Sequence, residues 1–102
     1  MSNTKLSYRA QLLLRVVDNC SDVEWSTGEV RRVFTPSEGT FYVTGPKGDD
    51  VRVHVSGSVA AAALKALESR GLIASRKLGL PLHCYVITEA GRAMIERGWD
   101  LR

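Results

Sequence analysis

The sequence predicts an α+β domain in which helices are separated by short antiparallel hairpins. Apolar residues recur at helical spacing over residues 5–20 and again over 58–70. Val51, Val53 and Val55 alternate with polar residues, which is typical of a strand with one buried face. Because the chain has 102 residues, we expect all of it, residues 1–102, to form a single domain around one core.

The first helix is expected from about Lys5 to Cys20, with Asn3 or Thr4 as its cap. Two apolar rows run along it at helical spacing. The first row is Leu6, Ala10, Leu13, Val17 and Cys20, and the second is Tyr8, Leu12 and Val16. A helix that is apolar on more than one side is buried on more than one side. The second row therefore either packs into the same core or meets a second subunit, and the pattern allows both.

A short second helix is expected over residues 27–34, after a link that has room for a small strand at 23–25. Thr27 is placed to cap this helix. Its apolar side would consist of Val30, Val33 and Phe34. Arg31 and Arg32 would then point away from the core.

A β-hairpin is expected at residues 40–55, inserted between the second and third helices. Two β-rich runs, Thr40–Thr44 and Val51–Val55, flank a loop that contains Gly, Pro and Asp. Phe41 and Val43 are expected to share the buried face with the valines of the second run. A two-stranded hairpin is marginal in water, so this one must lie on the helices or on a partner.

A third helix is expected over residues 58–70, with Ser58 as its cap and Gly71 as its end. Its core side would be Val59, Ala60, Ala63, Leu64 and Leu67. Its exposed side would be Ala61, Ala62, Lys65, Glu68 and Ser69. The exposed side chains are small, apart from one lysine and one glutamate.

Two strands at 72–78 and 83–87 are expected next, around a turn at Gly79 and Pro81. Thr88 is placed to cap a last helix, with an acidic residue in its first turn. Helix, hairpin and helix in direct succession form the back half of a winged helix-turn-helix. The predicted order for the chain is helix, helix, inserted hairpin, recognition helix, wing and C-terminal helix.

Two short motifs carry a resemblance to a known family. Leu67–Ile73 reads LESRGLI and Tyr85–Gly91 reads YVITEAG. Over residues 58–98 the chain resembles MarR- and PadR-type winged-helix transcriptional regulators. In that family the helix before Gly-Leu-Ile enters the major groove of DNA, and Tyr-x-Leu-Thr-x-x-Gly closes the wing onto the next helix. Ile87 stands where the family commonly has Leu.

The front half departs from this family, because the two helices of a helix-turn-helix are usually three or four residues apart. Here the inserted hairpin separates them. It would act as a second wing, a lid or a dimer surface.

The resemblance implies a sequence-specific double-stranded DNA-binding protein, a small transcriptional regulator or repressor that acts as a homodimer. The candidate residues for DNA binding are Arg31, Arg32, Ser56, Ser58, Ala61, Ala62, Lys65, Ser69, Arg76 and Lys77. Ser58, Lys65 and Ser69 would face the groove, and small alanines permit close approach to a thymine methyl group. The arginines and Lys77 would hold phosphates.

The charge balance agrees with this assignment. The net charge is +3. Residues 1–57 hold seven basic and seven acidic side chains, whereas residues 58–102 hold seven basic and four acidic ones. The surplus of positive charge thus lies in the winged segment, where phosphate contacts are needed.

A rival hypothesis is a winged-helix protein-interaction module, a subunit or adaptor without DNA readout. Leu78, Leu80 and Leu82 surround the turn of the wing, and leucines suit contact with a protein partner. The alanine-rich third helix favours the same hypothesis.

Other function classes find little support in the sequence. Cys20 and Cys84 lack metal or redox spacing, and the two histidines are isolated. No catalytic constellation or phosphate-binding loop is evident, so we expect a protein that is not an enzyme and that needs neither metal nor cofactor. The chain has no apolar run of membrane-spanning length and no signal-peptide pattern, so a cytoplasmic location is expected.

Overall fold

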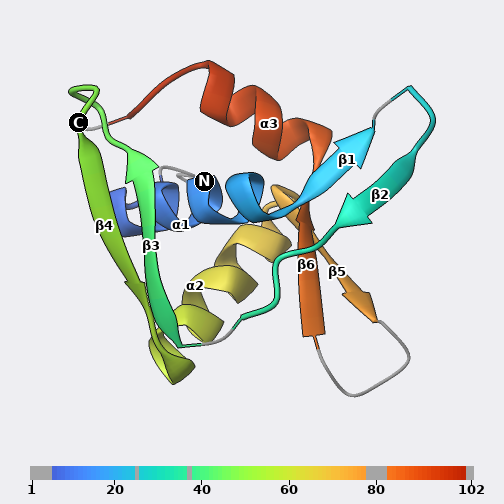
Figure 1. Ribbon diagram of the computed structural model, residues 1–102, viewed down its shortest axis with the longest axis horizontal. Coiled ribbons are helices and arrows are strands. Elements are labelled where there is room, and N and C mark those ends of the chain that lie inside the picture. Colours follow the sequence, from blue (N-terminus) through green and yellow to red (C-terminus); the bar gives the residue numbers. More distant parts are fainter. Residues whose placement is uncertain (1–5, 25, 37, 78–82, 101–102) are drawn as a thin grey trace.

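The computed structural model describes residues 6–24, 26–36, 38–77 and 83–100, without the side chains of residues 58, 59, 77 and 83. In chain order, the elements are α1 (Tyr8–Cys20), β1 (Asp22–Glu24), β2 (Glu29–Arg32), β3 (Gly39–Thr44), β4 (Asp50–Val55), α2 (Gly57–Ser69), β5 (Ile73–Lys77), β6 (His83–Ile87) and α3 (Glu89–Glu96). The strands form three two-stranded antiparallel sheets. In Figure 1, α1 and α2 lie at the centre between the β3–β4 and β5–β6 hairpins. The protein is thus α+β, as the sequence predicts.

The central helix is α1, and its cap is Ser7 rather than Asn3 or Thr4. The Ser7 hydroxyl accepts the Ala10 N–H at 3.1 Å, so the helix begins at Tyr8. Leu12 and Val16 of the second apolar row are buried, whereas the Tyr8 side chain is 44% exposed. This row therefore packs into the core of the same chain, apart from its first residue.

Residues 27–34 do not form a helix, and that prediction is wrong. The chain reverses at Gly28, whose φ is 74°, and β2 then pairs with β1 so that Val23 faces Val30. The Thr27 hydroxyl accepts the Glu29 N–H at 3.3 Å within this turn instead of capping a helix. So short a helix is marginal by itself, whereas a strand pair brings two β-branched side chains together. The small strand expected at 23–25 is found as β1; Trp25 lies outside the described residues.

Phe34 links the front of the chain to the back. Its N–H donates to the Tyr85 carbonyl at 2.7 Å, and the Tyr85 N–H donates to the Phe34 carbonyl at 2.8 Å. This bridge extends the β5–β6 sheet by one residue pair. The Phe34 ring is buried and lies edge-on to the ring of Phe41, with 5.9 Å between centroids. The backbone pairing is long-range, and it holds Phe34 in extended conformation.

The inserted hairpin is confirmed as β3 and β4, paired from Gly39 opposite Val55 to Thr44 opposite Asp50. Its turn is closed by the Gly45 N–H, which donates to the Asp49 carbonyl at 2.7 Å. Gly48 has a φ of 82°, the left-handed conformation that three-residue hairpin loops require. The inward side chains that are buried are Val43, Val53 and Val55.

The back half follows the prediction closely, with one difference at the start of α2. Ser56, and not Ser58, occupies the cap position, and its side chain makes no capping hydrogen bond. At the other end, Gly71 has a φ of 76° and its N–H donates to the Glu68 carbonyl at 2.9 Å. The Leu72 N–H donates to the carbonyl of Leu67 at 3.1 Å. This pair of bonds ends the helix in the manner expected of a glycine.

Thr88 begins α3 and also ties it to the end of α2. Its hydroxyl accepts the Gly91 N–H at 3.1 Å, which confirms the predicted cap, and donates to the Gly71 carbonyl at 2.7 Å. The two sequence motifs of the back half, LESRGLI and YVITEAG, are therefore in direct contact. That contact fixes the angle at which the β5–β6 hairpin leaves α2.

The segment after α3 returns to α1. The Gln11 side chain donates to the Asp100 carbonyl at 2.7 Å and accepts the Asp100 N–H at 2.9 Å. The Arg15 guanidinium lies 3.7 Å from the centre of the Trp99 ring, which also packs on Tyr8. The face of α1 near its start is thus covered by the chain's own C-terminal segment.

Candidate nucleic-acid interface

The exposed face of α2 is the centre of the candidate interface. Ala61, Ala62, Lys65 and Ser69 are all exposed, whereas Ala60, Leu64 and Leu67 face the core. Helical spacing brings the four exposed residues onto one side, and Ala66 joins them there. The Ser69 hydroxyl donates to the Ala66 carbonyl at 3.0 Å, so it presents lone pairs outward rather than a free proton. Lys65 is the one cation of this row.

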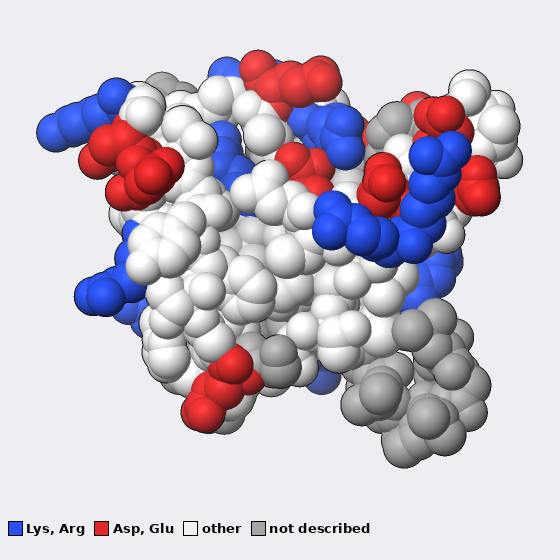
Figure 2. Space-filling model, viewed as in Figure 1, with Lys and Arg blue, Asp and Glu red and all other residues white. Residues whose placement is uncertain are grey.

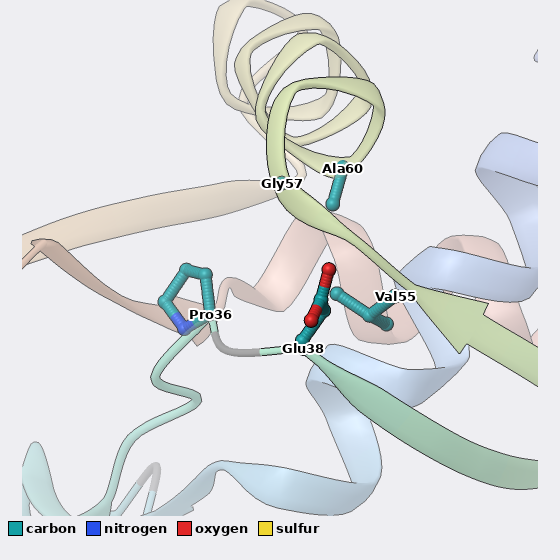
Figure 3. Close-up of a pocket in the computed structure, with 5 residues that line it drawn as sticks. All are labelled: Pro36, Glu38, Val55, Gly57 and Ala60. Atoms are coloured by element: carbon teal, nitrogen blue, oxygen red, sulfur yellow. The ribbon is translucent and has the colours of Figure 1, made fainter.

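The start of α2 differs from its middle, because a carboxylate lies beside it. A pocket of about 260 Å³ is lined by Pro36, Glu38, Val55, Gly57 and Ala60. Figure 3 shows the Glu38 side chain pointing from the segment before β3 toward Val55 and Ala60, close to the first turn of α2. A negative charge near the N-terminus of a helix is favourable for the helix dipole and unfavourable for a phosphate at the same place.

Ser56 and Ser58 were both predicted to take part in binding. Ser56 is half-buried at the cap position of α2, and the side chain of Ser58 lies outside the described residues. Glu38 was not predicted, since nothing in its own neighbourhood of the sequence relates it to a helix that begins far along the chain.

The β5–β6 hairpin, which the sequence predicts to be a wing, carries one described cation, Arg76. It is exposed on β5 opposite Cys84, on the strand face that also carries Ala74 and Val86. The other face carries Ile73 and Ile87, which are buried in the core. By strand alternation, Arg76 therefore lies on the opposite side of the hairpin from Ile73 and Ile87, where its neighbours Cys84 and Val86 are also buried. The Lys77 side chain and the turn with Leu78, Leu80 and Leu82 lie outside the described residues.

A groove of about 410 Å³ separates the wing from the β1–β2 hairpin. Its walls are formed by residues of β1, β2, β5, β6 and the start of α3: Val23, Gly28, Val30, Ala74, Arg76, Val86, Ile87, Thr88 and Glu89. Arg76 lies near the end of β5 in this groove, which is lined by both polar and apolar side chains. The structure thus places Arg76 next to the first hairpin and not beside Lys65.

Arg31 and Arg32 belong to β2 and not to a helix, and both have partners within the chain. The Arg31 Nε lies 3.5 Å from a carboxylate oxygen of Glu29, and Arg32 donates to the Asn19 carbonyl at 2.9 Å. The ion pair is exposed on both sides, so it contributes little and can be exchanged for another anion. The two arginines belong to β2, and the β1–β2 hairpin lies beside the β5–β6 hairpin in Figure 1.

Two basic residues included in the sequence charge count are engaged inside the fold. Arg15 is buried against Trp99, and burial lowers the pKa of its guanidinium while the Asp18 carboxylate partly opposes this shift. Arg92 of α3 forms an ion pair of 3.0 Å with Asp18 of α1. In the view of Figure 2, charged side chains lie mainly around the edge of the molecule, and uncharged side chains fill the centre over β3 and α2.

Two titratable side chains, Tyr85 and Cys20, have a pKa above the ordinary value. Burial raises the pKa of the Tyr85 phenol on β6, and the nearby Glu68 carboxylate raises it further. Burial also raises the pKa of the Cys20 thiol, although Arg32 acts in the opposite direction. Cys20 and Cys84 are free thiols, and Cys84 is fully buried.

Within the described ranges, no group of three or more His, Cys, Asp or Glu residues is arranged to hold a metal ion. None of the helices in the described part is long and apolar enough to cross a membrane. Comparison of the chain with protein-family models, with curated proteins and with solved structures gave no match.

Proposed function

We propose that this chain is a winged-helix protein that binds double-stranded DNA, with α2 as its recognition helix and the β5–β6 hairpin as its wing. The observation that carries the proposal is the exposed row of small side chains around Lys65 on α2. The wing follows this helix directly, and Thr88 and Gly71 hold the two at a fixed angle. A helix that lacks bulky side chains on its outer face fits into the major groove with little steric hindrance.

The order of the elements supports the winged-helix assignment. The bridge at Phe34 occupies the place of a first strand, and α2, β5, β6 and α3 follow as recognition helix, two wing strands and last helix. The β3–β4 hairpin stands where a helix-turn-helix has its first helix, directly before the recognition helix. In this proposal the hairpin supports the recognition helix in place of that missing helix, because Val53 and Val55 pack into the same core as Ala60 and Leu64.

Phosphate contacts would come from separate elements of the chain: Lys65 on α2, Arg76 on the wing, and Arg31 and Arg32 on the first hairpin. Base contacts would come from Lys65, Ser69 and the methyl groups of Ala61 and Ala62. We further propose that the protein acts as a homodimeric regulator of transcription, as its resemblance to MarR- and PadR-type regulators over residues 58–98 implies.

The wing arginine and lysine provide the first test. Replacing Arg76 and Lys77 together by Ala should weaken binding to all duplex sequences and should lower the slope of log affinity against log salt by about two units at most. The reason is that each phosphate contact releases roughly one counterion. Fluorescence anisotropy with a labelled duplex at several salt concentrations measures the slope.

The matched control for this test is the double variant Arg9→Ala with Arg97→Ala, which removes two exposed cations from α1 and from the end of α3. It should leave the slope near that of the parent. Equal slopes for the wing variant and the parent would remove the wing from the interface. Absence of any salt-dependent binding by the parent would contradict the proposal as a whole.

Glu38 provides a second test, in which the substitution should strengthen DNA binding instead of weakening it. Glu38→Gln removes the carboxylate beside the first turn of α2 and should tighten DNA binding by about two- to fivefold, the equivalent of one charge near a helix terminus. Glu24→Gln removes the same charge from the exposed end of β1 and serves as the control. Unchanged affinity in Glu38→Gln would show that DNA phosphates do not approach the start of α2.

The second candidate function is a protein-interaction module, and one observation favours it. The Tyr42 side chain is 62% exposed on β3, opposite the exposed Arg52 of β4. Tyrosine and arginine side chains are both enriched at protein interfaces. The salt titration distinguishes the two functions, because contacts with a protein do not require the release of counterions from DNA.

A further inference from the structure

Among the residues that the structure describes, no strand pairs with the outer edge of β4, which lies at the rim of the molecule (Figure 1). Figure 1 shows β3 between β4 and the rest of the structure. The Gly45 N–H bonds to the Asp49 carbonyl, and bonded pairs alternate along an antiparallel ladder. With the observed register, Val51, Val53 and Val55 bond toward β3. The N–H and C=O groups of Asp50, Arg52 and His54 therefore point away from β3, and these three residues are exposed.

This edge lacks several of the features with which proteins usually protect strand edges, although it carries the charged residues Asp50 and Arg52. The segment Asp50–Val55 contains neither Pro nor Lys, and its register runs without a bulge. By contrast, the register of β1 with β2 shifts between Asp22 and Val23, and the edge of β6 is bridged by Phe34. A regular edge is a template for pairing with another strand.

We infer that β4 pairs with β4 of a second copy of this chain, in an antiparallel arrangement around a two-fold axis at Val51. The two hairpins then form one continuous sheet, in which the outward N–H and C=O groups of both β4 edges gain hydrogen-bond partners. In such a pair, the two residues that face each other lie on the same side of the sheet. The two-fold axis must therefore pass between a residue and the identical residue of the other copy, and it cannot pass midway between two neighbouring positions of the strand.

Charge complementarity selects Val51 as the axis. With the axis at Val51, Asp50 of each copy faces Arg52 of the other, and opposite charges in facing positions are stabilising. An axis at Arg52 would place two arginines opposite each other, which is destabilising. An axis at Val53 would place Arg52 opposite His54 and would leave Asp50 without a basic partner.

The other dimer surface suggested by the sequence, on α1, is already used within the single chain. The second apolar row of α1, the alternative dimer surface, is buried within the single chain apart from Tyr8.

Because a strand pair buries little area, we expect association at micromolar concentrations or weaker. A DNA duplex with two binding sites would strengthen it by holding two copies together. The inference itself does not depend on DNA binding.

Reversal of the two charges tests the pairing. Asp50→Arg places an arginine opposite Arg52 of the other copy, and Arg52→Asp places two acids opposite each other, so each single variant should stay monomeric. The double variant restores opposite charges and should dimerise like the parent. An equimolar mixture of the two single variants should also dimerise, because one copy then supplies both arginines and the other both aspartates.

Sedimentation velocity without DNA, over micromolar to millimolar protein concentrations, measures each case. Circular dichroism should show that all variants are folded, since both residues are exposed. Lys65→Glu on α2 reverses a charge outside this edge and should dimerise like the parent. A monomeric parent, dimeric single variants or a monomeric mixture would each overturn the inference.

Discussion

Gly91→Ala is expected to destabilise the protein by about 2–4 kcal/mol, although alanine is the better helix former. A Cβ atom at Gly91 would lie 2.1 Å from the Leu72 carbonyl oxygen and 3.0 Å from the Ile87 Cδ1. The first of these is backbone, which cannot move away as the end of a side chain does. The Leu72 carbonyl also accepts the Thr88 N–H at 3.2 Å, so relief of the clash would strain the start of α3.

Thermal and urea unfolding of Gly91→Ala measure this loss. Ala93→Gly is the control, because Ala93 is exposed on the same helix and should lose only the helix propensity, about 1 kcal/mol. If helix propensity outweighed the clash, Gly91→Ala would raise the melting temperature, and the close contact between α3 and the end of α2 would be wrong.

Val53→Asp is expected to destabilise the protein by about 4 kcal/mol or more, because it places an unpaired charge in the core. The Val53 side chain is 7% exposed and belongs to the same buried cluster as Leu14, Leu64 and Phe34. Domains have a free energy of unfolding of about 5–15 kcal/mol in total, so the variant should melt well below the melting temperature of the parent.

The control for this variant is His54→Asp, the next residue on the same strand, whose side chain is exposed. A change there should alter stability by at most about 0.5 kcal/mol. Loss of structure in Val53→Asp alone would establish that the inserted hairpin is part of the fold. If its melting temperature equals that of the parent, the hairpin is a free flap, and its exposed Lys47 and Arg52 become candidates for DNA contact.

The two halves of the chain differ in how well local signals describe them. In the back half, each element has its own start or stop residue close by in the sequence: Gly71 ends α2 and Thr88 caps α3. Such signals act over a single turn of backbone, so they can be read without knowledge of the fold. The strand alternation at Val51, Val53 and Val55 is equally local and predicted the β3–β4 hairpin with its buried face.

The segment 27–34 shows that a local sequence pattern can predict the wrong secondary structure. Val30, Val33 and Phe34 have the spacing of a helix face, but the hydrogen bonds that decide their conformation come from elsewhere. Phe34 pairs with Tyr85, and β2 pairs with β1 across a turn in which Gly28 adopts a positive φ. A helix this short has too few internal bonds to compete with pairing to a preformed strand.

The residues of the candidate interface also fall into those that the sequence identifies and those that only the tertiary structure identifies. The exposed row of α2 follows from helical periodicity, and Ala61, Ala62, Lys65 and Ser69 were identified from the sequence alone. The carboxylate of Glu38 beside the first turn of α2, the internal partners of Arg31 and Arg32, and the position of Arg76 beside the first hairpin depend on contacts between distant segments.

The sequence by itself determined the α+β class, the helix, hairpin and helix of the back half, and the side of α2 that faces outward, because periodicity and capping act between near neighbours. The tertiary structure alone decided that a strand pair replaces the second helix and that α1 is covered by its own chain. It also left the edge of β4 open. These features depend on which distant backbone groups find partners, and a buried backbone group without a partner is too costly to remain unpaired.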